Sequence, residues 1–358
     1  MTTRRGFLAT LLAASALPNL SWADAGNPAY LSAAKMPDGR FVMCGLSAEG
    51  VQKFSIPLPA RGHAATAHPT RPEAVAFARR PGSYALVLNC TNGEVIAQLA
   101  PPSDSQFNGH GTFSRDGSIL YTSEVIATSS EGRIGLWDAA DMYRRIGSRP
   151  SGGIGPHDLK RLPGSDTLVV ANGGIQTDPD DRTKLNIDTM RPNLTYLDAS
   201  GQITDQIELP PEYRQNSIRH LAIAADRTVA FALQWEGDTA DSAPLLGLHK
   251  QGTAPKLCDV PEAEMFVMQG YAGSIAFDAV GTTVAITSSH GGAVQIYRRD
   301  GSFLAGLSRP DASGIAPGKT GFVLTDGFGS ISSLINQTLT PLTVGDALWD
   351  NHLVALDG

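Results

Sequence analysis

Five of the eight histidines share one place in a repeated sequence pattern. Each stands at or near the head of a short apolar stretch that is followed by a turn and a second apolar stretch. Imidazole is a favoured ligand for zinc, copper, iron and nickel, so five imidazoles brought together would form a metal site. A structural role is the alternative, in which each imidazole forms hydrogen bonds with the backbone at its strand. The five residues are His63, His110, His157, His220 and His352.

The stretch around His110 shows the repeating unit most clearly. Residues 109–117 read GHGTFSRDG, and residues 118–122 read SILYT. Asp116-Gly117 predicts a type I′ hairpin turn between two short strands, because this turn requires positive φ at both central residues. We call the start of each such stretch its head. Comparable heads occur near residues 63, 157, 220, 274, 314 and 352. Their spacing of roughly 40 to 60 residues, built from short strands, is typical of the blades of a β-propeller.

We therefore predict an all-β fold, a seven-bladed β-propeller that occupies residues 26–358 as a single domain. The last stretch, at His352, has no strands after it, whereas residues 29–57 contain three strands without a head. We expect these two ends to share one blade, because closing the ring removes an open sheet edge. A six-bladed ring or a two-sheet solenoid is the alternative.

Propeller geometry would gather the repeated histidines, since the inner strands line the central channel and begin at one mouth of it. The heads at Ser274 and Gly314 lack histidine, which leaves a gap for a ligand or an open coordination position. His68, His249 and His290 do not occupy the repeat position. We expect those three at the surface.

Other polar residues near the heads are candidates for supporting roles. Asp158 adjoins one repeated histidine, and Asp238 follows a strand. Such carboxylates can ligate a metal or fix an imidazole tautomer, although ordinary turn acids are the favoured interpretation. Met265 and Met268 could offer thioether ligands to Cu(I), but core packing is favoured for them.

The interval between His157 and His220 is the longest and holds a polar insert at residues 172–190. Such an insert must cross one face of the ring, where loops often carry function. A purely solvated loop is the alternative. We take Asn186 in this insert, together with Arg219 and Glu236, as the candidate cofactor-binding residues.

Residues 1–25 have the features of a twin-arginine export signal. The sequence TRRGFL at residues 3–8 precedes a short apolar segment and a small-residue cleavage site at residues 23–25. The apolar segment is shorter than the roughly 20 residues of a membrane helix, so we expect no membrane span. Export by this route predicts a periplasmic protein. A formal net charge of −7 argues against nucleic acid as a partner.

The three cysteines are Cys44, Cys90 and Cys258. One disulfide with one free thiol is one interpretation, and three buried thiols in strands is the favoured one. The sequence contains no serine-nucleophile elbow, HExxH metal motif, phosphate loop or covalent haem motif. Any chemistry must therefore come from residues that only the fold brings together.

Several stretches resemble a family of exported bacterial propeller proteins classed by a domain of unknown function. They are residues 155–159 (GPHDL), 171–175 (ANGGI), 184–190 (KLNIDTM), 217–221 (SIRHL) and 234–238 (QWEGD). The resemblance implies a seven-bladed propeller of the YVTN or quinoprotein-dehydrogenase type in the periplasm. It also implies partners, because members are often encoded beside imelysin-like iron-uptake lipoproteins and a di-haem peroxidase-like protein.

These observations lead to three functional hypotheses. The first is a monomeric periplasmic metal-binding accessory protein of an iron or copper uptake system, with the metal on the five histidines. The second is an enzyme that uses the same pocket, either a metal-dependent oxidoreductase or a lactonase-like hydrolase. The third is an interaction scaffold whose face binds the neighbouring uptake proteins.

Overall fold

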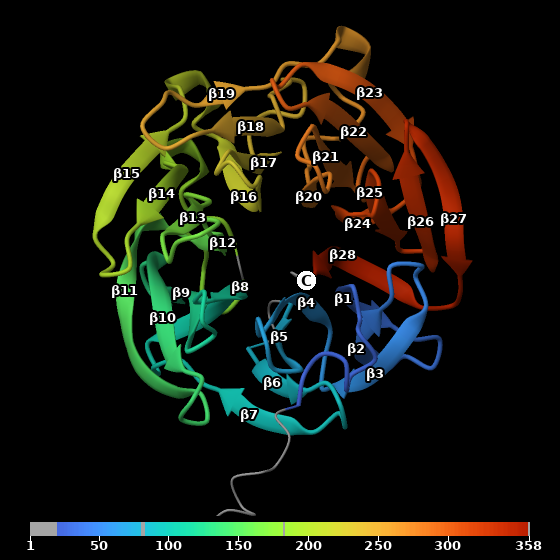
Figure 1. Ribbon diagram of the computed structural model, residues 1–358. Helices are drawn as coiled ribbons and strands as arrows, with labels where there is room; N and C mark the ends of the chain where they lie inside the picture. The colour runs from blue at the N-terminus through green and yellow to red at the C-terminus, as the bar shows by residue number, and fades with distance from the viewer. Residues whose placement is uncertain (1–19, 80–82, 182, 357–358) are drawn as a thin grey trace, which may run out of the picture.

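The structure is a computed structural model that describes residues 20–79, 83–181 and 183–356. These residues form seven four-stranded antiparallel sheets, arranged as blades around a central axis (Figure 1). The prediction of a seven-bladed β-propeller is confirmed. The twin-arginine motif at residues 3–8 lies outside the described residues, so the export signal stays a prediction.

Each blade runs from an inner strand at the axis to an outer strand at the rim. The inner strands are β4 (Gly62–Ala67), β8 (Ser105–Phe113), β12 (Pro156–Arg161), β16 (Asn216–Ile223), β20 (Ser274–Phe277), β24 (Ala312–Pro317) and β28 (Leu348–Ala355). The second strands are β5 (Glu73–Ala78), β9 (Ile119–Ile126), β13 (Leu168–Asn172), β17 (Val229–Trp235), β21 (Thr283–Ser288), β25 (Phe322–Asp326) and β1 (Tyr30–Lys35).

The remaining strands complete the blades in the same order. The third strands are β6 (Ala85–Asn89), β10 (Glu131–Asp138), β14 (Asn193–Leu197), β18 (Leu246–His249), β22 (Ala293–Arg298), β26 (Ser330–Ile335) and β2 (Phe41–Leu46). The outer strands are β7 (Val95–Leu99), β11 (Arg144–Ile154), β15 (Ile203–Glu208), β19 (Lys256–Leu257), β23 (Phe303–Ser308), β27 (Thr338–Val344) and β3 (Gln52–Leu58). Three short 3₁₀ turns are also described: η1 (Ile187–Thr189), η2 (Pro211–Tyr213) and η3 (Glu262–Glu264).

The ring closes as the sequence predicts. β28 pairs with β1, so the last strand of the chain is the inner strand of a blade whose other three strands come from the start (Figure 1). The Ser32 hydroxyl donates to the His352 carbonyl at 2.9 Å across this pair. The closure therefore fixes one histidine-bearing strand directly to the N-terminal strands.

The second strands are buried on both sides, which explains their continuous apolar sequences. In β17, the residues Val229 to Leu233 are each 0% exposed. Blades pack face to face, so both faces of a middle strand meet a neighbouring sheet, and the sequence need not alternate. The outer strand β15 shows the opposite pattern, with no fully buried residue. The core thus lies between blades and holds the inner strands in place around the axis.

The Asp116-Gly117 hairpin differs from the predicted type I′ turn. Gly117 has φ of +76°, but Asp116 is not among the described residues with positive φ. The loop is wider than two residues, because the strands end at Phe113 and resume at Ile119. The Asp116 carboxylate accepts hydrogen bonds from the Ser114 and Ser118 hydroxyls and stabilises this wider turn.

All three cysteines are free and buried. Burial raises the pKa of the Cys44 thiol to about 11 and of the Cys90 and Cys258 thiols to about 12. These thiols are therefore protonated and inert at neutral pH. The interpretation as buried thiols is confirmed, although only Cys44 lies within a strand. No helix in the described residues is long and apolar enough to cross a membrane.

Candidate metal centre

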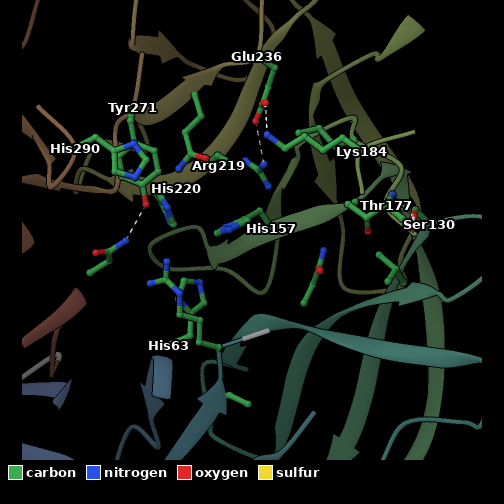
Figure 2. A pocket seen from close by; sticks show the side chains of 18 residues that line it. His63, Ser130, His157, Thr177, Lys184, Arg219, His220, Glu236, Tyr271 and His290 are labelled. Carbon is green, nitrogen blue, oxygen red and sulfur yellow. Dashed lines mark hydrogen bonds and ion pairs between the residues drawn. The ribbon is translucent and has the colours of Figure 1, made fainter. Parts of the chain in front are cut away.

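The five repeated histidines meet at the propeller axis, each from a different inner strand. Their ring centroids lie 4.9 Å apart for His63 and His110, 4.6 Å for His157 and His220, and 4.7 Å for His220 and His352. His63 and His352 are 4.6 Å apart, which closes the group. Figure 2 shows three of them, His63, His157 and His220, among the side chains that line a pocket. The convergence predicted from the repeat is therefore present.

An irregularity in strand pairing accompanies each of these histidines. The register of β12 shifts between Pro156 and Asp158, which leaves His157 without a direct partner on β13. Similar shifts occur in the stretches that contain or adjoin the other four histidines. A bulge adds a residue to one strand and re-aims side chains. In β16 it lies at Arg219, and both Arg219 and His220 consequently reach the pocket.

Gly109 allows β8 to pass close to His63. A Cβ atom at this position would lie 2.7 Å from His63 Cδ2, and the residue has φ of +96°. Both conditions favour glycine. The glycine that precedes His110 in the sequence thus makes room for the histidine of the neighbouring blade.

Asp158 orients His110. Its Oδ1 lies 3.3 Å from His110 Nδ1, and the carboxylate also accepts the backbone N–H groups of Leu159 and Leu221 at 2.8 and 3.0 Å. The imidazole Nδ1–H is therefore directed at the carboxylate, and Nε2 faces the other histidines, 3.2 Å from His63 Nε2. Asp158 is 4% exposed, so the interpretation as an ordinary turn acid is wrong for this residue.

Burial sets the charge state of the cluster. It lowers the pKa of His63, His157, His220 and His352 well below the ordinary value, and neighbouring imidazoles and basic side chains lower it further. Burial also raises the pKa of the Asp158 carboxyl. Lys160 and His110 outweigh that effect and hold this pKa below its usual range. At neutral pH the four imidazoles are neutral and carry the lone pairs that a metal requires.

Four buried ring nitrogens have no hydrogen-bond partner among the described residues. They are His63 Nδ1, His157 Nδ1, His220 Nδ1 and His352 Nε2. An unpartnered buried polar atom costs about 1–3 kcal/mol, so four at one place indicate a missing partner. Backbone hydrogen bonding, the structural alternative, does not account for these four atoms.

Two groups of three histidines have ligand atoms within 4.8 Å of one another: His63, His110 and His157, and His110, His220 and His352. Both groups include His110, whose Nδ1 faces Asp158. Only its Nε2 remains for a metal, so the groups describe two alternative positions for one ion. Metal–nitrogen bonds of about 2.0–2.1 Å would draw the rings slightly inward.

A pocket of ≈ 260 Å³ lies over the cluster, with His63, His157 and His220 among its lining residues (Figure 2). Two of the predicted cofactor-binding residues, Arg219 and Glu236, line its wall. Their side chains lie 3.6 Å apart. The pocket therefore gives a ligand access to the histidines from one face of the ring.

Asn186, the third predicted cofactor-binding residue, is not among the described residues that line the pocket. Its amide donates to the Gly174 carbonyl at 2.9 Å and accepts the Gln176 N–H at 2.7 Å, so it holds the base of the insert. Lys184 from the same insert does line the pocket and pairs with Glu236. The insert thus reaches the site through a residue that the sequence did not single out.

The three remaining histidines are not simple surface residues. His68 is 4% exposed and its Nδ1 accepts the Arg71 N–H, whereas His249 is 2% exposed and lies 2.6 Å from the Tyr196 hydroxyl. His290 is exposed, as predicted, but it lines the pocket and stacks on Tyr271 at 3.9 Å between centroids (Figure 2). The prediction that His68 and His249 lie at the surface was therefore wrong.

The other supporting candidates, two methionines and Asp238, lie away from the histidine cluster, and one prediction about them is wrong. Met268 is fully buried in the core between two blades, which confirms core packing for it. Met265 is exposed, and its sulfur accepts the Ser242 hydroxyl at 3.7 Å, so core packing was the wrong prediction for this residue. Asp238 accepts the Ala240 N–H and behaves as a turn acid.

Comparisons with known proteins support the fold. A chain of hydrazine synthase from Kuenenia stuttgartiensis is 13% identical, with a TM-score of 0.61 over 89% of this chain and 96% of that chain. A chain of the mitotic checkpoint complex is 11% identical, with a TM-score of 0.54 over 78% of each chain. At such identities the likeness shows the fold alone. No curated protein matches the chain. The model of a family described as "Protein of unknown function (DUF1513)" matches residues 56–356, and the chain therefore belongs to this family.

Proposed function

We propose that this protein is a periplasmic metal-binding accessory protein of an iron or copper uptake system, exported by the twin-arginine route. The observation that carries the metal site is the group of four buried, unpartnered ring nitrogens on four blades. Two groups of three histidines also have ligand atoms within 4.8 Å of one another, which supports a ligand in common. The site is held by the ring itself, so no further domain is needed to assemble it.

The donor set supports a borderline transition metal. Imidazole nitrogens suit Cu, Fe, Zn and Ni, whereas Mg and Ca prefer oxygen ligands. Asp158 orients His110, as carboxylates commonly do for metal-bound imidazoles. The uptake role, the periplasmic location and the imelysin-like and di-haem peroxidase-like partners rest on the sequence resemblance and the export signal.

Elemental analysis of the untagged protein purified from the periplasm tests the metal site. We expect near-stoichiometric iron or copper in the wild type and loss of the metal in a His110→Ala/His157→Ala variant. His290→Ala is the matched control, because this histidine lines the pocket but is exposed and belongs to neither group of three. Circular dichroism shows whether each variant is folded. A wild type that takes up no metal even after reconstitution would make the histidines structural.

A metal-dependent oxidoreductase is the second candidate, and the pocket over the histidines favours it. A catalytic metal needs a position that is open to substrate, and three of the five histidines line the pocket. Turnover by the metal-loaded protein in the presence of an electron acceptor would support this candidate. Stable metal retention without turnover would support the accessory role.

A further inference from the structure

The wall of the pocket carries an excess of positive charge. Arg79, Lys184 and Arg219 line it, and Glu236 is the one carboxylate among the described lining residues. The chain as a whole has the opposite sign, with a formal net charge of −7. A positively charged concave site concentrates anions around it, even when the molecule as a whole is negatively charged. The expected ligand is therefore an anion.

Nearby carboxylates do not cancel this excess. Glu236 is shared between Lys184 and Arg219, which is 3.6 Å away. Asp350 is buried and does not line the pocket; it pairs with Arg79 at 3.2 Å and also with a second arginine, Arg61. Each carboxylate thus serves two cations, and the formal excess of two positive charges remains.

The size and polarity of the pocket narrow the class of anion. Its volume of ≈ 260 Å³ lies just below the roughly 300–1,000 Å³ of sites for drug-sized ligands. Ser130, Thr177 and Gln234 also line it, and Figure 2 shows Ser130 and Thr177 across the pocket from Tyr271 and His290. Hydroxyl and amide groups bind carboxylate and hydroxyl oxygens. A small, hydrophilic, multiply charged anion fits this lining.

We propose that the pocket binds a small oligocarboxylate anion and that the metal reaches the histidines as the chelate of that anion. The second half of this inference rests on the proposed metal site. A positively charged wall disfavours entry of a bare dication and favours a negatively charged chelate. The carboxylates of the bound anion contact Arg79, Lys184 and Arg219. This arrangement places the chelated metal next to the histidines that line the pocket.

Transfer to the protein is then a ligand exchange. Metal–oxygen bonds to the carboxylates break and metal–nitrogen bonds to the imidazoles form. The freed oligocarboxylate keeps its own electrons and leaves as the anion. Each new metal–nitrogen bond uses a lone pair of a ring nitrogen, and no electron is transferred in this step.

Calorimetric titration with citrate, without metal, tests the anion site. We expect citrate to bind the wild type and Lys184→Gln to weaken binding about three- to fivefold, as for a half-exposed charge. Arg219→Gln removes a more buried charge and should weaken it at least about tenfold. Glu236→Gln should tighten it. Lys319→Gln and Arg191→Gln are the matched controls, because both residues pair with a glutamate at the surface and lie outside the pocket.

A parallel titration with copper(II) alone separates this inference from the proposed function. We expect Lys184→Gln to leave copper affinity unchanged or higher, while it lowers citrate affinity. Citrate that does not bind the wild type, or that binds Lys184→Gln and Lys319→Gln equally, overturns the inference even if copper binds. Citrate binding that depends on Lys184, without any copper binding, contradicts the metal site and leaves the anion site standing. Lys184 is about half exposed, so its replacement keeps the test informative if the Arg219 variant does not fold.

Discussion

Asp158 links the candidate metal site to the surrounding backbone. Its carboxylate contacts His110 and accepts two backbone N–H groups, one of them from β16 of the next blade. We expect Asp158→Asn to reduce metal affinity about 10- to 100-fold, because such positioning carboxylates typically contribute that much. Metal titration measures this loss. Asp238→Asn, at the turn acid, is the control, and equal metal affinity in the two variants would contradict the positioning role.

The buried histidines also make the stability of the metal-free protein depend on pH. Burial lowers their pKa in the folded state, whereas unfolded histidines take up protons near pH 6.5. The unfolded state therefore binds more protons below about pH 6.5, and the free energy of unfolding falls as pH is lowered. Each histidine contributes up to about 1.4 kcal/mol per pH unit. His68 and His249 add a contribution of the same sign.

Thermal unfolding of the metal-free protein at pH 7.5, 6.5 and 5.5 checks this dependence. We expect the midpoint temperature of unfolding to change little between pH 7.5 and 6.5 and to fall steeply between pH 6.5 and 5.5. A His63→Gln/His352→Gln variant should show a shallower fall. A midpoint that stays constant down to pH 5.5 would show that the imidazoles are not buried as neutral groups.

At the scale of elements, the inner strands position the site through their irregularities. Regular pairing would place alternate side chains on opposite faces of a blade. The register shifts turn the histidines towards the axis instead, and Gly109 lets β8 pass beside His63. The insert between β13 and β14 adds Lys184, which ties it to Glu236 at the end of β17. One loop and several bulges thus bring side chains to the site that the regular strand repeat would not place there.

Gly109→Ala tests the close approach of β8 to His63. We expect a loss of metal affinity together with a loss of about 1–3 kcal/mol in the free energy of unfolding, from backbone strain and from the clash. Denaturant titration and metal titration measure the two effects. Gly252→Ala is a closely matched control, since Gly252 has φ of +82° with nothing within 4 Å of the added Cβ. Unchanged metal affinity in the Gly109 variant would contradict the role of this approach.

At the scale of the whole molecule, seven blades bring to one axis residues that are up to 289 positions apart, His63 and His352. The sequence predicts this much because each blade repeats a pattern of turns and apolar strands that local chemistry determines. The histidines recur at the same place in that pattern, so their convergence follows from the fold. Ring closure is predictable for the same reason, from unpaired strands at one end and an unpaired head at the other.

The sequence does not predict what depends on contacts between blades. The sequence around Asp158 is compatible with an ordinary turn acid. Its structural role depends on the N–H of Leu221, which β16 of the next blade provides. His68 and His249 sit next to turn residues, yet local hydrogen bonds and packing bury both. Lys184 reaches the pocket only through the path of the insert. The register shifts have no local signature, because a bulge is defined by pairing with another strand.

X-ray absorption spectroscopy of the copper-loaded protein tests the central claim, that imidazoles from several blades share one metal ion. We predict a first shell dominated by nitrogen, with the outer-shell scattering of about three imidazole rings, as the two groups of three histidines require. The His110→Ala/His157→Ala variant should lose this signature. A spectrum with oxygen ligands alone, or one unchanged in the variant, would contradict the claim and return the five histidines to a structural role.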